Sequence, residues 1–188
     1  MNTVTLESPK TPLHWAQLYK LYLNAFPRSE RKPFSIITRQ YRKGIFDVWC
    51  VRQKGQFAGL AITVKSDQLV LLDYLAIKKD CRNQGIGTAV LSLLQQKYAG
   101  KGLFLEIESV YEDAPDLALR QRRKQFYLRC GMTPMGVMIC LFGVNMELLG
   151  FDCKISFDRY HQFYMDNVGS WAAGHVTSLP HPENFTNA

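Results

Sequence analysis

Two glycines one residue apart stand in the segment RNQGIGT, residues 82–88, between the apolar run LVLLDYLAI and the helix-like AVLSLLQQKY. A loop with few side chains at the start of a helix lets several backbone N–H groups converge on one anion, and the helix dipole favours negative charge there. The segment has neither the GxxxxGK pattern of a P-loop nor the GxGxxG pattern of dinucleotide-binding domains. It contains R-x-x-G-x-G instead, formed by Arg82, Gly85 and Gly87. We therefore predict a phosphate-binding loop.

Two glutamates alternate with apolar residues in the strand-like segment FLEIES. In an extended strand Glu106 and Glu108 point to the same face. Two carboxylates on one strand face cost free energy unless they are solvated, paired or used in chemistry. Like charges so close tend to raise one pKa, which suits a proton acceptor near neutral pH. Pairing with Arg122 or Arg123 on the following helix is the structural alternative, and the sequence leaves both interpretations open.

The period of the apolar residues predicts the elements that position these groups. A helix from Thr11 to Ala25 begins with a Thr-Pro cap, and a second helix is capped by Ser35 and ends near Gly44. A short edge strand, NTVTLES, precedes them, and three antiparallel strands at 45–52, 56–64 and 68–77 follow. The rest of the pattern predicts a helix at about 85–98, a strand at 102–109, a helix at 113–130, strands at 137–143 and 144–150, and a last helix at 156–168.

This order predicts one α/β domain over residues 1–188, with a mixed, mostly antiparallel central sheet flanked by helices. The strands at 68–77 and 102–109 should be parallel, because a helix connects them in a crossover. Residues 82–88 then lie at the carboxyl end of a strand, where open sheets bind ligands. The core is expected at about 11–150, and an additional C-terminal helix and tail at 151–188, with the tail from Gly169 loosely ordered.

Composition narrows the function classes. The net charge of +7 suits either a nucleic acid or a small, highly charged anion, but the Lys and Arg residues are scattered and no nucleic-acid-binding motif is present. Five cysteines without a CxxC pair argue against a disulfide framework and a zinc site. No apolar run has the length of a signal peptide or a membrane helix. We expect a cytoplasmic protein that binds neither nucleic acid, nor membrane, nor metal.

In this setting the RxxGxG loop resembles the pyrophosphate loop of the GNAT superfamily, the acyl-CoA-dependent N-acetyltransferases. Two helices and three antiparallel strands precede the loop, and a strand and a helix follow it. That helix carries FYLRCGM, which is similar to the family's FY…GF segment. The resemblance covers about residues 11–150. It departs from the family at Asn83, where many members have glycine, and at Met132, where many have phenylalanine.

The resemblance implies that backbone N–H groups of the loop cradle the pyrophosphate of acetyl-CoA, with Arg82 supplying positive charge. It also implies that backbone groups of Ala76 and Ile77 pair with the pantetheine arm, although plain core strand is an alternative there. The N–H of Ile77 would polarise the thioester carbonyl. The loop residues assigned to the coenzyme are Arg82, Asn83, Gln84, Gly85, Ile86, Gly87 and Thr88.

The same resemblance assigns roles in acetyl transfer to an amine. Tyr127, at the family's FY position on a helix face with Leu119, Arg123 and Phe126, would be the general acid that protonates the leaving thiolate; a core-filling tyrosine is the alternative. The strand pattern, and not the resemblance, makes Glu108, nearer the end of its strand, the expected base or amine anchor, and Glu106 is expected to contact the substrate.

The segment FPRSERKPF lies between the first two helices, a place that typically borders the acceptor site in this superfamily. Glu30 and Arg31 are therefore expected at the acceptor, with a solvated loop as the alternative. The expected function is acetyl transfer from acetyl-CoA to a primary amine of a small molecule or protein, by a monomer or homodimer. The alternative is a non-catalytic acyl-CoA sensor.

Overall fold

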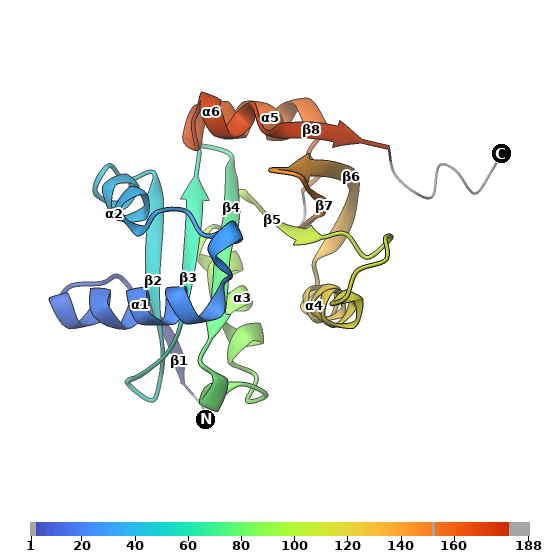
Figure 1. The fold of residues 1–188 in the computed structure, drawn as a ribbon. Helices are drawn as coiled ribbons and strands as arrows, with labels where there is room; N and C mark the ends of the chain where they lie inside the picture. Colours follow the sequence, from blue (N-terminus) through green and yellow to red (C-terminus); the bar gives the residue numbers. More distant parts are fainter. Residues whose placement is uncertain (1–2, 152, 181–188) are drawn as a thin grey trace. The chain divides into compact units, whose positions relative to one another are not determined.

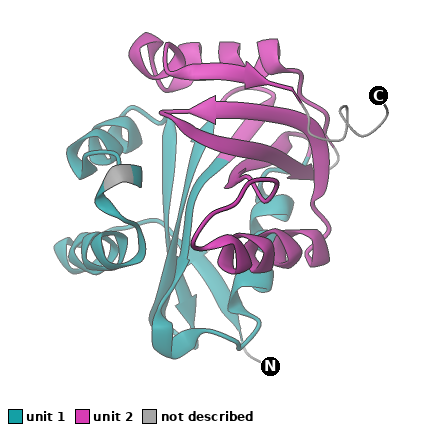
Figure 2. Ribbon diagram, turned by 45° about the vertical axis from the view of Figure 1, so that its right-hand side comes forward, with its two compact units in different colours: residues 1–65, 72–99 teal, residues 66–71, 100–188 magenta. Residues whose placement is uncertain are grey.

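The computed structural model of the protein describes residues 3–151 and 153–180. The chain divides into two compact units, which Figure 2 shows in different colours. Unit 1 comprises the residues up to 65 together with 72–99, and unit 2 comprises 66–71 together with the residues from 100 onward. Both units contain strands, helices and fully buried apolar side chains.

Unit 1 holds the N-terminal strands and helices (Figure 1). Its strands are β1 (Val4–Glu7), β2 (Phe46–Gln53), β3 (Gln56–Lys65) and the greater part of β4 (Leu69–Ile77). Its helices are α1 (Pro12–Ala25), α2 (Phe34–Arg42) and α3 (Ile86–Lys97), with short 3-10 turns η1 (Arg28–Glu30) and η2 (Lys79–Cys81). The strands β1, β2 and β3 pair antiparallel in this order. Asn2, the first residue of the predicted edge strand, lies outside the described residues.

Unit 2 contains β5 (Gly102–Glu108), α4 (Leu117–Arg129), β6 (Thr133–Leu141), β7 (Val144–Phe151), α5 (Phe157–Asn167), α6 (Ser170–Ala173) and β8 (Val176–Leu179). The first residues of β4 pair in parallel with β5, through Leu69–Leu71 and Gly102–Phe104. The pairs β5–β7, β7–β6 and β6–β8 are antiparallel. In Figures 1 and 2, α4 and α5 lie on opposite sides of the strands of this unit.

The strand order is β1-β2-β3-β4-β5-β7-β6-β8. The strand β4 begins in unit 2 and ends in unit 1. This mostly antiparallel sheet with flanking helices confirms the predicted fold class, including the parallel pair β4–β5. The sequence correctly predicted where α1 and α5 begin. Thr11 caps α1 by accepting from the N–H of His14, and Ser156 caps α5 by accepting from the N–H of Arg159.

Two predicted helix starts were wrong. The helix α2 begins at Phe34, directly after Pro33, whose carbonyl accepts from the N–H groups of Ile36 and Ile37, so Ser35 lies inside the first turn. The helix α4 begins at Leu117 and not at Asp113. The reason is Pro115, which disfavours helical geometry at the residue before it.

The predictions for one α4 residue and for the tail also need correction. Leu119 is 61% exposed and does not share a packed face with Phe126 and Tyr127. The tail is ordered through residue 180, because β8 pairs with β6 and Ala173 is buried. The remainder of the predicted tail, residues 181–188, lies outside the described residues.

Gly59 on β3 generates a prediction about packing against β4. A Cβ at this position would lie 2.5 Å from the carbonyl oxygen of Ala76 and 2.9 Å from Cδ1 of Ile77. Backbone atoms cannot retreat cheaply, so Gly59→Ala should lower the free energy of unfolding by about 1–3 kcal/mol. Urea unfolding followed by circular dichroism measures this change.

The matched control is Gly174→Ala, because a Cβ there would meet its nearest atoms at 3.4 and 3.5 Å, which is close to ordinary contact. Its stability should stay within about 0.5 kcal/mol of the wild-type value. Equal stability of the two variants would show that the close approach of β3 and β4 at Gly59 does not exist.

Candidate functional site

The predicted phosphate loop has an unusual backbone. After β4 ends at Ile77, η2 leads into residues 82–85, where Asn83 has φ of +60° and Gly85 has φ of +75°. Glycine adopts this left-handed conformation without strain, and asparagine tolerates it better than most residues. Many members of the GNAT superfamily, which the loop resembles, have glycine at this position. Asn83 can replace that glycine because it adopts the same left-handed backbone conformation.

The helix α3 starts directly after these two turns. Its first intrahelical hydrogen bond runs from the N–H of Ala89 to the carbonyl of Gly85, so the N–H groups of Ile86 and Gly87 belong to the exposed positive end of the helix dipole. The first turn of α3, all of it described, carries no acidic side chain. Thr88 is exposed in the same turn, while Ile86 is buried and fixes the helix to the core. This end of α3 suits a bound anion.

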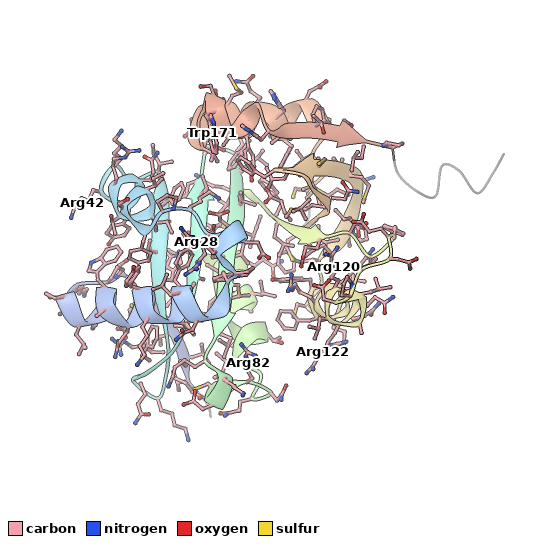
Figure 3. The ribbon with its side chains drawn as sticks, viewed as in Figure 1. Arg28, Arg42, Arg82, Arg120, Arg122 and Trp171 are labelled. Carbon is pink, nitrogen blue, oxygen red and sulfur yellow. The ribbon has the colours of Figure 1, made fainter. Side chains whose placement is uncertain are left out.

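Charged and polar side chains brace the loop from within. Nε of Arg82 donates to the carbonyl of Ile77 at 3.1 Å, which ties the exposed arginine to the end of β4 (Figure 3). Gln84 donates to the carbonyl of Asp80. Lys78 lies 3.0 Å from Asp80, and this hydrogen bond lowers the pKa of the Asp80 carboxyl below its usual value. The one acid in the segment is thereby partnered by a lysine, and Arg82 adds positive charge.

The end of β4 carries the two residues predicted to pair with a ligand's extended arm. Ala76 is buried, Ile77 is partly exposed, and the N–H of Lys78 donates to the carbonyl of Ala58 on β3. Gly59 allows β3 to approach closely at this point. The buried side chain of Ala76 belongs to the core, and the carbonyl of Ile77 already accepts from Arg82. Pairing of these two residues with a ligand's arm stays a prediction.

The loop between α1 and α2 is fixed by Tyr74 of β4. The Tyr74 hydroxyl donates to the carbonyl of Glu30 at 2.8 Å and accepts from the N–H of Lys32 at 3.1 Å. Arg31 reaches the carbonyl of Leu23 at 3.5 Å, near the end of α1. Glu30 and Arg31 thus lie in a loop whose backbone is held by β4 and α1.

Sequence reasoning missed Asp73, which lies next to Tyr74 on β4. Its side chain is only 5% exposed and bonds to Nζ of Lys32 at 2.7 Å. A single aspartate inside the apolar run LVLLDYLAI was the available signal, since a buried carboxylate needs a partner. The pair Lys32–Asp73 fastens the α1–α2 loop to the strand.

The two carboxylates of β5 have partners from different helices. Glu106 accepts from the hydroxyls of Tyr160 and Tyr164 of α5, at 2.7 and 2.8 Å. Glu108 bonds to Nη1 of Arg123 at 2.5 Å and lies 3.4 Å from Nη2 of Arg120, and both arginines belong to α4. The pairing alternative therefore describes Glu108, with Arg123 and Arg120 as its partners.

Tyr127 lies near the end of α4, one turn after Lys124. Desolvation by burial raises the pKa of Tyr127 to about 12, and the charge of Arg123 opposes this shift only in part. The carbonyl of Tyr127 accepts from the N–H groups of Cys130 and Met132, as the chain turns at Gly131 into β6. The phenol therefore stays protonated at neutral pH, as a proton donor requires.

The helix that carries Tyr127 is held largely by charge. Although every residue of α4 is described, none is fully buried, and Tyr127 is partly buried. The helix has no acidic residue of its own but five cations, namely Arg120, Arg122, Arg123, Lys124 and Arg129. The carboxylates that bind it come from elsewhere in unit 2: Glu108 of β5, Glu112 and Asp116 of the preceding loop, and Glu147 of β7.

Glu147 is the most buried of these carboxylates and was missed by sequence reasoning. It is 0% exposed and bonds through Oε2 to Nζ of Lys124 at 2.5 Å, while its Oε1 has no hydrogen-bond partner in the described chain. Lys124 also donates to the Tyr111 hydroxyl at 3.2 Å and lies 4.8 Å from the centre of that ring. Desolvation lowers the pKa of Lys124, but the bonds to Glu147 and Tyr111 outweigh it and raise the pKa overall.

This pair generates a prediction about stability. Lys124→Met would leave the buried Glu147 charge without its cation, which should cost about 3–5 kcal/mol of unfolding free energy. The double variant Lys124→Met, Glu147→Leu removes both charges and should recover most of that loss. Urea unfolding of the three proteins measures the difference. A loss below about 1 kcal/mol in the single variant would contradict a buried ion pair at this position.

Among residues 3–151 and 153–180, no group of three or more His, Cys, Asp or Glu side chains could hold a metal ion. Within the same ranges, no helix is both long and apolar enough to cross a membrane.

Known proteins share sequence features and the fold with this chain. Residues 15–132 match the model of the Acetyltransferase (GNAT) family. The chain is similar to the candidate acetyltransferase YjbC of Bacillus subtilis (strain 168), with 38% identity over 63 residues, which are 34% of this chain and 30% of that protein. The match to this curated relative thus spans less than a third of its length.

Solved structures share the fold at low sequence identity. A candidate GNAT-family acetyltransferase from Bacteroides thetaiotaomicron has a TM-score of 0.71 and 19% identity, with 87% of this chain and 96% of that chain covered. A GNAT family acetyltransferase from Elizabethkingia anophelis with acetyl-CoA bound has a TM-score of 0.58 and 16% identity, with 80% and 97% covered. Because the family model covers more than half of the chain and includes the RxxGxG loop, the protein belongs to the Acetyltransferase (GNAT) family.

Proposed function

We propose that this protein transfers the acetyl group of acetyl-CoA to a primary amine of a small molecule or protein. The observation that carries the proposal is the loop of residues 82–88, where left-handed residues at Asn83 and Gly85 lead into the N-terminus of α3. Such a loop binds a pyrophosphate through backbone N–H groups. The Elizabethkingia anophelis structure, which shares the fold, holds acetyl-CoA.

In this proposal the coenzyme is held mainly by backbone groups. The N–H groups of residues 82–88 bind the pyrophosphate, and Arg82 adds positive charge. Backbone groups of Ala76 and Ile77 pair with the pantetheine arm in the manner of an added strand. Part of the net charge of +7 then serves a polyanionic coenzyme.

The chemical step is a direct acyl transfer. The amine nitrogen attacks the thioester carbonyl carbon, a C–N bond forms, and the C–S bond breaks. The N–H of Ile77 stabilises the negative charge that develops on the carbonyl oxygen. The leaving thiolate takes a proton from the Tyr127 hydroxyl, which is protonated at neutral pH.

The amine must lose a proton to a base. Both oxygens of Glu108 face arginines of α4, so we assign Glu108 to holding that helix and not to proton transfer. Glu106 is partly exposed, and we propose that its carboxylate receives the acceptor as an ammonium ion and takes its proton. Glu30 and Arg31 would border the acceptor from the α1–α2 loop.

Coenzyme binding is tested by thermal unfolding with acetyl-CoA, ATP and NAD. At about a hundredfold excess over Kd, acetyl-CoA should stabilise the protein by about 2.7 kcal/mol, and ATP and NAD should do much less. Gly87→Val should abolish the acetyl-CoA effect without a large change in the unliganded protein, because its side chain blocks the approach of the phosphates. An equal shift with ATP would contradict the proposed coenzyme.

Transfer is tested by thiol release from acetyl-CoA with a panel of amines: cadaverine, tyramine, kanamycin and the tripeptide Ala-Ala-Ala. Tyr127→Phe should lower kcat roughly 100- to 10,000-fold at nearly unchanged acetyl-CoA affinity, because phenylalanine keeps the packing but lacks the proton. Turnover near the wild-type value would make Tyr127 a core residue. Tight acetyl-CoA binding without transfer to any amine would favour the non-catalytic sensor.

A further inference from the structure

Helix α5 presents two buried tyrosines to the carboxylate of Glu106. The Tyr160 and Tyr164 side chains are 0% and 1% exposed, and both hydroxyls bond to the same oxygen, Oε1, at 2.7 and 2.8 Å. The two rings lie one helical turn apart with their centroids 4.9 Å from each other. Both donors therefore come from one rigid face of the helix.

Apolar packing holds this face in place. The Phe104 ring of β5, two residues before Glu106, lies edge-on to Tyr160 at 6.2 Å and to Phe163 at 5.3 Å. Phenylalanine would fill the positions of the tyrosine rings equally well, but it could not donate to a carboxylate. A buried hydroxyl costs free energy unless it is bonded, and Glu106 supplies such a bond to both hydroxyls.

The burial of the rings limits what the tyrosines can do. Side chains that are fully buried do not touch a substrate, whereas Glu106 itself is partly exposed. Their action must pass through the carboxylate, whose position two donors on one oxygen define more tightly than one would. Both tyrosines also lie beyond residue 132, where the match to the family model ends.

We infer that Tyr160 and Tyr164 are positioning residues for the acceptor: they fix Glu106 in the orientation that receives an alkylammonium group. The inference rests on the proposed function. It assigns a role to the C-terminal helix, which controls the use of the amine without affecting the coenzyme. The acceptor class is an amine that arrives protonated, with its charge opposite the Glu106 carboxylate.

A structural role for the tyrosines makes a different prediction, and Tyr98 supplies the matched control. Tyr98 is also buried, and its hydroxyl donates to the Asp47 carboxylate at 2.7 Å within unit 1. Tyr98→Phe should cost stability as the α5 variants do but leave the KM for the amine unchanged. The comparison separates a lost buried hydrogen bond from a lost orientation of Glu106.

The experiment measures thiol release with the best amine of the panel for Tyr160→Phe, Tyr164→Phe and their double variant, alone and combined with Glu106→Gln. The double variant should raise the KM for the amine about tenfold or more at an unchanged KM for acetyl-CoA. In the Glu106→Gln background the same substitutions should change the amine KM by less than about twofold, because the group they position has lost its charge. If the double variant does not fold, the single variants carry the same comparison.

The inference is overturned if the double variant keeps the wild-type KM for the amine and only melts at a lower temperature, as Tyr98→Phe should. A full additional effect in the Glu106→Gln background would overturn it as well. If the wild-type protein acetylates no amine, the proposed function fails and the inference falls with it. Transfer by the wild type together with an unchanged amine KM in all tyrosine variants refutes the inference alone.

Discussion

The proposed activity depends on one constraint: the backbone of residues 82–85 must turn so that its N–H groups and the N-terminus of α3 point to the same place. Asn83 and Gly85 must both adopt positive φ so that α3 can begin at Ile86, directly after the loop. In the proposed site the ligand is bound by backbone N–H groups, so side chains must not cover these groups, although they can brace the loop, as Arg82 does at the carbonyl of Ile77. Glycine is required where the backbone itself is the ligand-binding surface.

In unit 2 the main constraint is that three carboxylates of the strands each need a hydrogen-bonding partner. Glu106 receives two neutral hydroxyls, Glu108 receives arginines, and Glu147 receives a lysine in the interior. The cations on α4 thus do more than solubilise a helix: they bind Glu108 and Glu147 and hold the element that carries Tyr127.

The phosphate loop could be predicted because its signal is local. The glycines, the preceding strand and the following helix are adjacent in sequence, and the left-handed conformation of Gly85 follows from the residue type. Strand geometry predicts that Glu106 and Glu108 share a face, whereas their observed partners belong to two different helices, α5 and α4. Arg123 was among the predicted partners and does bind Glu108, but the tyrosine partners of Glu106 were not predicted, because α5 follows β5 by some fifty residues.

The burial of Asp73 and Glu147 was also not predicted, because their lysine partners lie far away in the sequence. Asp73 and Glu147 each stand alone among apolar residues, and sequence cannot tell whether such a residue faces solvent or a lysine from a distant element. The strand β8 escaped because its four residues become a strand only by pairing with β6. The period of apolar residues indicates which face of a helix or strand is buried. It does not indicate which other element packs or pairs with that face.

Amide hydrogen exchange in residues 82–88 tests most directly whether this loop binds the pyrophosphate of acetyl-CoA. Acetyl-pantetheine is the matched ligand, because it carries the same thioester and arm without the pyrophosphate. Saturating acetyl-CoA should slow exchange at the loop and first-turn amides, and acetyl-pantetheine should leave them near their unliganded rates. Exchange in residues 82–88 that acetyl-CoA does not change, or that acetyl-pantetheine slows equally, would contradict the account.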